Sequence, residues 1–233
     1  MSPILFSLYV DEMLRRLERS GVGCYVQGVF AGALCYADDI TLICPSLHGL
    51  NEMISVCDKF ADDYLVLFNA KKSVAINFGG NAGVDGYVMV GNQALPWSEQ
   101  CVHLGNMITR DLKDSCDVAR KIGHFVSAVN SLVGNFSSCT NLLTLRRLFS
   151  AYCCSFYGSQ LWRIDSRDEK RVCTSWNKAV RRVLRLPLRS HTWLLGPLLD
   201  QPHLRSQLHL RSWGFVTSLA CSENVIGLKL ILS

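Results

Sequence analysis

The chain has 233 residues, 49% of them hydrophobic, and a net charge of +5 at pH 7, which predicts one or two globular domains with a sizeable core. No stretch approaches the ~20 consecutive apolar residues of a membrane-spanning helix, and no basic segment precedes the apolar start, so we expect neither a membrane protein nor a signal peptide. The eleven cysteines include no C-x-x-C pair, which argues against a zinc site and favours reduced, mostly buried thiols.

The first predicted elements are a helix and a hairpin. Ser2 suits the N-cap and Pro3 the first turn of a helix whose apolar residues recur at intervals of three and four. Two short apolar runs, Val29–Cys35 and Ile40–Cys44, then predict paired strands on either side of Tyr36-Ala37-Asp38-Asp39.

The tip of this hairpin carries two adjacent aspartates, where a tight turn normally favours Asn-Gly or Asp-Gly. Neighbouring carboxylates repel each other, and a hard divalent cation such as Mg²⁺ removes that repulsion by binding their oxygens. Asp38 and Asp39 are therefore candidate metal ligands. The alternative is a solvated turn in which both side chains face water and bind nothing.

Further short elements are expected before residue 110, and helices after it. Ser46 caps a second helix that extends to Tyr64, followed by short strands at 66–68 and 74–78, a hairpin at 87–95 and a strand at 102–108. Apolar periodicity then predicts helices over 112–134, 140–157, 166–186 and 204–221. Three tryptophans of this helical region, Trp162, Trp176 and Trp193, are expected to pack in a core rather than to stack on bases.

Four segments, in one order along the chain, resemble the reverse transcriptase of a non-LTR (LINE-type) retrotransposon. Ser2–Phe6 is similar to the end of that family's Gln-Gly-x-x-Leu-Ser-Pro segment, and Tyr36–Asp39 to its metal-binding hairpin. Phe68–Ser73 is similar to its Asn-x-x-Lys-Ser segment, and Leu104-Gly105 to the Leu-Gly of its primer-grip region. Later segments, among them Tyr157–Trp162, are similar to the helical region that follows the polymerase core in many animal elements.

The resemblance implies an α+β fold, with a partial polymerase palm of β-hairpins and helices over residues 1–110 and a mostly helical, thumb-like region over residues 111–233. It implies RNA-directed DNA synthesis by two-metal nucleotidyl transfer in the nucleus. An RNA template, a DNA primer and deoxynucleotides are the implied partners, and Mg²⁺, held by Asp38 and Asp39, is the implied cofactor.

The same resemblance assigns further roles around the metal hairpin. Lys72 approaches the phosphates of the incoming nucleotide or protonates the pyrophosphate leaving group, and the alternative is a solvated turn lysine. Tyr36, Leu104 and Gly105 contact nucleic acid. His103 stands where the family commonly has a tyrosine before Leu-Gly, which leaves that aromatic contact to the primer without a residue.

A third catalytic aspartate of the family lies upstream of the Gln-Gly segment, and this sequence starts within that segment. Asp11 is expected on a helix surface and does not replace it. Two-metal catalysis needs both ions clamped by shared carboxylates. We therefore expect a missing upstream polymerase segment and no polymerisation by this chain alone. The alternative is a non-catalytic remnant that serves as a nucleic-acid-binding or interaction module.

The charge is divided unevenly. Residues 1–100 hold six basic and eleven acidic side chains, a net charge of −5, whereas residues 101–233 hold 18 basic and 8 acidic side chains, a net charge of +10. A basic region suits a phosphate backbone, although basic helices also serve solubility alone. The candidate phosphate contacts are Arg146, Arg147, Arg181, Arg182, Arg185 and Arg189. Among these, Arg181 and Arg185 are expected on one helix face because they lie four residues apart.

Overall fold

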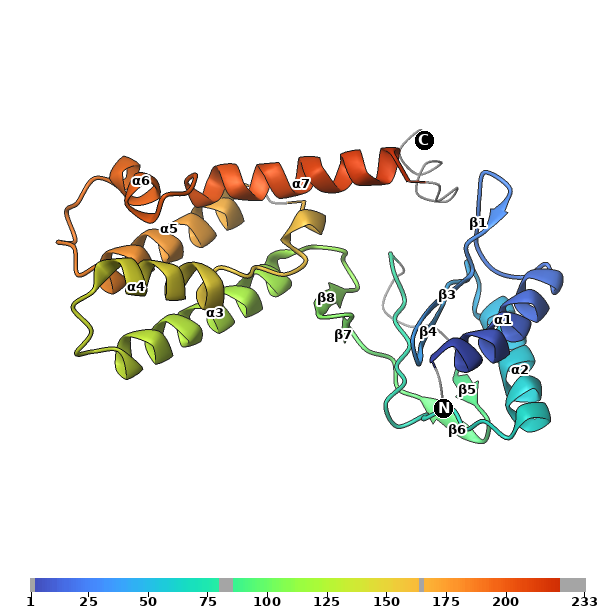
Figure 1. The fold of residues 1–233 in the computed structure, drawn as a ribbon. Helices are drawn as coiled ribbons and strands as arrows, with labels where there is room; N and C mark the ends of the chain where they lie inside the picture. Colours follow the sequence, from blue (N-terminus) through green and yellow to red (C-terminus); the bar gives the residue numbers. More distant parts are fainter. Residues whose placement is uncertain (1–2, 80–85, 164–165, 223–233) are drawn as a thin grey trace. The chain divides into compact units, whose positions relative to one another are not determined.

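A computed structural model describes residues 3–79, 86–163 and 166–222 of the chain (Figure 1). The chain divides into two compact units, Met1–Glu99 with Leu219–Ser233, and Gln100–Ser218. The first unit contains small β-hairpins with helices and the second is mostly helical, so the fold is mixed α+β.

Two helices, α1 (Pro3–Arg19) and α2 (Leu47–Tyr64), form the core of the first unit. Their apolar faces meet through Met13 and Leu17 on α1 and Met53 and Phe60 on α2, all of which are buried. The predicted N-cap of α2 is confirmed, because the hydroxyl of Ser46 accepts a hydrogen bond from the backbone N–H of Gly49 at 3.1 Å.

Three hairpins complete the described part of the first unit, each a separate antiparallel pair. They are β1 (Tyr25–Val26) with β2 (Val29–Phe30), β3 (Ala33–Tyr36) with β4 (Asp39–Leu42), and β5 (Val88–Val90) with β6 (Gln93–Leu95). The last pair confirms the hairpin predicted around the Gly91-Asn92 turn.

The strands predicted at 66–68 and 74–78 are wrong. Both segments are irregular, and among the residues that the structure describes their one ladder contact is an isolated bridge between Ala75 and Trp97. Ala75 donates to the carbonyl of Pro96 at 3.2 Å and accepts from Ser98 at 2.8 Å. These bonds engage the backbone of Ala75 with the segment after β6, so the two predicted strands do not pair with each other.

The second unit begins with a fourth hairpin, β7 (Gln100–His103) with β8 (Asn106–Thr109). The single strand expected over 102–108 is therefore wrong. Leu104 and Gly105 form the turn, with φ values of 46° and 77°. Two consecutive residues with positive φ reverse the chain in the type of turn that joins twisted strands most tightly.

Helices form the rest of the described second unit. They are α3 (Ser115–Asn135), α4 (Leu142–Leu148), α5 (Ser166–Val183), α6 (Leu195–Leu199) and α7 (Leu204–Ala220), with a π-helix, η1 (Phe149–Cys153), directly after α4 and short 3₁₀ turns η2 (Ser159–Leu161) and η3 (Thr192–Leu194). The helix predicted over 140–157 thus ends earlier, at Cys153. Within the described residues, no helix combines the length and the apolar character needed to cross a lipid bilayer.

One hydrophobic core joins these helices, and it contains Phe125, Phe149 and Trp176. Trp162 and Trp176 are 7% and 0% exposed, which confirms the expectation that they pack in a core. The same expectation is wrong for Trp193, whose side chain is 69% exposed. All eleven cysteines are free thiols. Burial raises the pKa of the Cys57 and Cys154 thiols to about 12, so both remain protonated at neutral pH.

Candidate functional site

The two adjacent aspartates lie at the tip of the β3–β4 hairpin, as the sequence predicts. Tyr36 pairs with Asp39 across the hairpin, which leaves Ala37 and Asp38 as a two-residue turn. Ala37 has a φ of 52°, the left-handed conformation that such turns use at their first central position. Asp39 begins β4, so the two carboxylates come from the turn and from the first residue of the strand after it.

The hairpin has one face toward the core and one open face. Ala33, Cys35, Ile40 and Leu42 pack against the cluster formed by α1 and α2. Side chains alternate along a strand, so their neighbours point the other way. Tyr36 is 67% exposed on that open face, and Asp39 is its exposed cross-strand neighbour.

Both carboxylates are exposed, and within residues 3–79, 86–163 and 166–222 neither has a hydrogen-bond or ion-pair partner. Two neighbouring, unpaired carboxylates at an exposed hairpin tip suit a hard divalent cation. The described residues bring together no group of three or more histidine, cysteine or acidic side chains able to hold a metal ion. The chemistry of the tip therefore fits part of a Mg²⁺ site, in which Asp38 and Asp39 would be two of the ligands.

The segment around Lys72 is a local turn that Asn69 organises. The Asn69 side-chain oxygen accepts a hydrogen bond from the backbone N–H of Lys72 at 3.2 Å. The Asn69 carbonyl accepts from the backbone N–H of Ser73 at 3.1 Å and from its hydroxyl at 3.0 Å. This Asx-type turn explains why asparagine and serine flank the lysine, and it leaves the Lys72 side chain exposed.

The Leu104-Gly105 turn lies in the second unit, where α3 holds it in place. The Gly105 carbonyl accepts a hydrogen bond from the Arg120 guanidinium at 2.5 Å. Next to it, the Asn106 side-chain oxygen accepts from the Lys121 ammonium at 2.6 Å. Two consecutive residues of α3 therefore fix the tip of the β7–β8 hairpin.

A buried carboxylate, Asp117, completes this network, and the sequence analysis did not identify it. Its side chain is 3% exposed and forms ion pairs with Lys121 at 2.8 Å and Arg120 at 3.3 Å. It also accepts hydrogen bonds from the Met107 backbone at 2.9 Å and the Trp162 indole at 2.7 Å. Its spacing to Arg120 and Lys121 is the signal in the sequence, because residues three and four apart meet on a helix.

Burial alone would raise the pKa of Asp117, but the hydrogen bonds from Lys121, Trp162 and Met107 outweigh it and hold that pKa below its ordinary value of 3.8. Asp117 is therefore ionised at neutral pH and balances the buried Lys121 ammonium. We refer to Asn106, Asp117, Arg120, Lys121 and Trp162 as the α3 network.

The structure places three of the candidate arginines at carbonyl and amide groups of the second unit. Arg181 donates to the Ser190 carbonyl at 2.8 and 3.2 Å, and Arg182 donates to the Asn130 side chain. Arg185 donates to the carbonyls of Ser137 and Cys139 at 2.5 and 3.0 Å. The expectation that Arg181 and Arg185 share a helix face is wrong, because α5 ends at Val183 and Arg185 has a φ of 54°.

The remaining arginines face solvent more freely. Arg146 lies 3.5 Å from the Asp200 carboxylate, a weak surface ion pair. Arg147, its neighbour on α4, is exposed and pairs with no residue in the described parts of the chain. Arg189 is also exposed, in the loop after α5.

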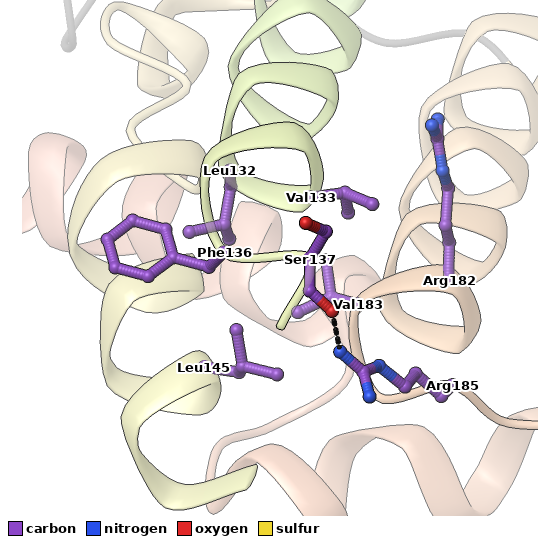
Figure 2. A pocket seen from close by; sticks show the side chains of 8 residues that line it. All are labelled: Leu132, Val133, Phe136, Ser137, Leu145, Arg182, Val183 and Arg185. Carbon is purple, nitrogen blue, oxygen red and sulfur yellow. Dashed lines mark hydrogen bonds between the residues drawn. The ribbon is translucent and has the colours of Figure 1, made fainter. Parts of the chain in front are cut away.

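Figure 2 shows a hollow between α3, α4 and the end of α5, with Arg182 and Arg185 beside it. Leu132, Phe136 and Leu145 supply apolar parts of its wall. Its volume is about 170 Å³. Ligand pockets for small molecules usually measure about 300–1,000 Å³, so this hollow does not support such a site.

One comparison with known proteins found a match over the part of the chain that carries the acidic hairpin. Residues 1–108 match the family model for reverse transcriptase (RNA-dependent DNA polymerase). The match includes Asp38, Asp39 and Lys72, reaches β8, and does not distinguish between types of retroelement. No curated protein matches the chain significantly.

Proposed function

We propose that the chain is the C-terminal part of a non-LTR retrotransposon reverse transcriptase, which copies RNA into DNA in the nucleus. Residues 1–110 contribute part of the palm, and residues 111–233 form the thumb-like region after it. The reverse transcriptase match over residues 1–108 supports the domain assignment. The observation that carries the proposal is the β3–β4 register, which places Asp38 and Asp39, both exposed, at the tip of the hairpin.

In this proposal Asp38 and Asp39 hold Mg²⁺ through their carboxylate oxygens. Bound divalent ions stabilise the attacking and leaving oxygens during phosphoryl transfer. The chain's own contribution is to fix the two carboxylates on a hairpin whose other face is anchored to α1 and α2. Lys72, held by the Asn69 turn, meets the nucleotide phosphates as an exposed point charge.

The second unit contacts the RNA template and the DNA primer. Residues 101–233 carry 18 basic and 8 acidic side chains, an excess that attracts a phosphate backbone. Arg147 is the most accessible of the arginines on α4 and suits a phosphate contact. Arg181 and Arg185 bind carbonyls of their own unit, so their role in this proposal is to position the loops that follow α3 and α5.

The 233-residue chain alone does not polymerise DNA in this proposal. The described residues gather two carboxylates at the hairpin tip and no third ligand. Metal binding at such a site is weak, because each lost carboxylate removes both a ligand and a negative charge.

A primer-extension assay tests this directly. The chain is incubated with an RNA template, an annealed DNA primer, deoxynucleotides and Mg²⁺, in parallel with the Asp38→Asn variant. We expect no extension by either protein. Extension by the unaltered chain that Asp38→Asn abolishes would contradict the proposed inactivity and would establish a complete active site within these 233 residues.

The second candidate function is a non-catalytic nucleic-acid-binding or interaction remnant, which the excess of basic side chains in residues 101–233 favours. The nucleotide sequence upstream of the first codon separates the two candidates. An in-frame continuation that encodes a Gln-Gly segment and a further aspartate on a strand supports the polymerase. A stop codon immediately upstream supports the remnant.

A further inference from the structure

An exposed tyrosine from a distant segment lies directly against the Leu104-Gly105 turn. A Cβ atom added to Gly105 would be 3.2 Å from Cε1 and 3.4 Å from Cδ1 of Tyr157. The tyrosine ring therefore packs over the glycine of the turn, where no side chain intervenes. The Tyr157 side chain is nevertheless 62% exposed, so much of it remains open to solvent.

The α3 network fixes this ring in place. The Lys121 ammonium lies 6.0 Å from the centre of the Tyr157 ring, within the range of a cation–π contact. The next residue, Gly158, has a φ of 78°, and a Cβ there would lie 1.8 Å from the Asn106 side-chain oxygen. The backbone next to Tyr157 thus approaches the α3 network so closely that only glycine fits at position 158.

The surroundings of the ring are positively charged. Arg120 and Lys121 contribute two cations to the network and Asp117 contributes one carboxylate, which leaves one net positive charge. The Lys121 side chain is 8% exposed and paired with Asp117, so Arg120, with 23% of its side chain exposed, is the cation of the network that can attract a phosphate. An exposed aromatic ring beside such a cation suits an unpaired base, because the ring stacks on the base and the cation attracts its phosphate.

We propose that Tyr157 is a stacking site for an unpaired nucleobase of the template or primer strand, beside the Leu104-Gly105 turn. This inference rests on the proposed function, in which the second unit contacts nucleic acid. Stacking needs the flat ring and not the hydroxyl group, so Tyr157→Phe retains binding and Tyr157→Leu loses it.

The test compares variants of the full chain by fluorescence anisotropy with a labelled RNA–DNA primer-template that has a single-stranded overhang. Tyr157→Leu should weaken binding by about five- to a hundredfold, the usual effect of removing one stacked aromatic residue. Tyr157→Phe should bind like the unaltered chain. The matched control is Tyr152→Leu, which removes a similarly exposed tyrosine, 73% accessible, from η1 of the same unit. Circular dichroism establishes that each variant is folded.

A second readout locates the base. A 2-aminopurine placed in the overhang loses fluorescence when it stacks, and this quenching should disappear in Tyr157→Leu and persist in Tyr157→Phe and Tyr152→Leu. If the unaltered chain binds and Tyr157→Leu binds equally well, the stacking site is wrong and the proposed function stands. If the unaltered chain does not bind the primer-template at all, both proposals are wrong.

Discussion

At the residue scale, Asp117 holds together three segments of the second unit. One of its oxygens binds the Lys121 ammonium and the Trp162 indole, and the other binds the Met107 backbone. A buried ion pair contributes little net stability by itself, but removing one partner leaves the other charged and unpaired. Asp117 is thus a structural residue beside a proposed binding surface.

The substitution Asp117→Asn keeps the shape of the side chain and removes its charge. We expect a loss of about 3–5 kcal/mol in the free energy of unfolding, because the buried Lys121 ammonium loses its counter-charge. Urea unfolding followed by circular dichroism measures it. Asp62→Asn makes the same chemical change at an exposed position of α2. That control should change stability by less than about 0.5 kcal/mol. Equal effects of the two substitutions would show that the Asp117 contacts are unimportant.

The lowered pKa of Asp117 predicts part of the loss of folding stability at acidic pH. The pKa of Asp117 in the folded chain lies below 3.8. On acidification the unfolded carboxyl group takes up its proton first, so the stabilising contribution is present well above 3.8 and is lost as the pH falls through 3.8 toward the lower folded pKa.

Unfolding measured at several pH values between about 6 and 3 should give a shallower acid loss for Asp117→Asn than for the unaltered chain. Hydrogen bonds also lower the pKa values of Asp111, first through Thr109, and of Glu169, first through Arg205. These two carboxylates keep some acid sensitivity in the variant. Identical slopes for both proteins would rule out the contribution of Asp117.

At the scale of elements, the sequence predicted those whose signals are local. The apolar spacing of α1 and α2, the Ser46 cap and the apolar runs beside Asp38-Asp39 each depend on near neighbours. The structure confirms the two helices, the cap and the acidic hairpin, but it divides the run Val29–Cys35 between β2 and β3. Hence the acidic hairpin of the candidate site was predictable. The turn at Leu104-Gly105 was not predictable, because leucine rarely adopts a positive φ.

Long-range contacts account for what the sequence did not reveal. In the sequence, Asp117 is recognisable only as a helix residue close to two cations. Its buried hydrogen bond comes from the indole of Trp162, 45 residues further along the chain. Arg185 follows a helical pattern, but the helix ends before it and its side chain binds carbonyls beyond the end of α3. Such pairings are set by tertiary packing, which overrides local propensity.

The junction between α3, the β7–β8 hairpin and the segment before η2 depends on Gly158. A side chain there would overlap Asn106 and Lys121, so we expect Gly158→Ala to destabilise the second unit by at least about 2 kcal/mol. Gly123→Ala is the matched control, since nothing lies within 4 Å of a Cβ at that position of α3. Alanine there should stabilise the helix by about 0.5–1 kcal/mol.

Thermal or urea unfolding of both glycine variants measures these opposite effects. If Gly158→Ala is neutral while Gly123→Ala is stabilising, the close approach of Gly158 to the α3 network is wrong. The comparison is internal to one unit, so it does not depend on how the two units are arranged.

At the scale of the whole molecule, each of the two units has its own role in the proposed function. The acidic hairpin and Lys72 belong to Met1–Glu99 with Leu219–Ser233, and the basic helices belong to Gln100–Ser218. The reverse transcriptase match covers the described hairpins of the first unit and extends only to β8 of the second. Asp38 and Asp39, the proposed metal ligands, thus lie within the matched residues, whereas most of the basic helices lie beyond them.

The most direct test of the central claim is paramagnetic Mn²⁺, a substitute for Mg²⁺, titrated into the isotope-labelled chain and followed by backbone NMR. The account predicts that amide signals of Tyr36–Ile40 broaden first, that excess Mg²⁺ restores them, and that Asp38→Asn with Asp39→Asn removes the effect. The adjacent pair Asp62 and Asp63 on α2 is the internal control, because it carries the same charges and Asp63 is already paired with Arg16 at 2.5 Å. Equal broadening around both pairs, or broadening that persists without Asp38 and Asp39, would contradict a metal site at the hairpin tip.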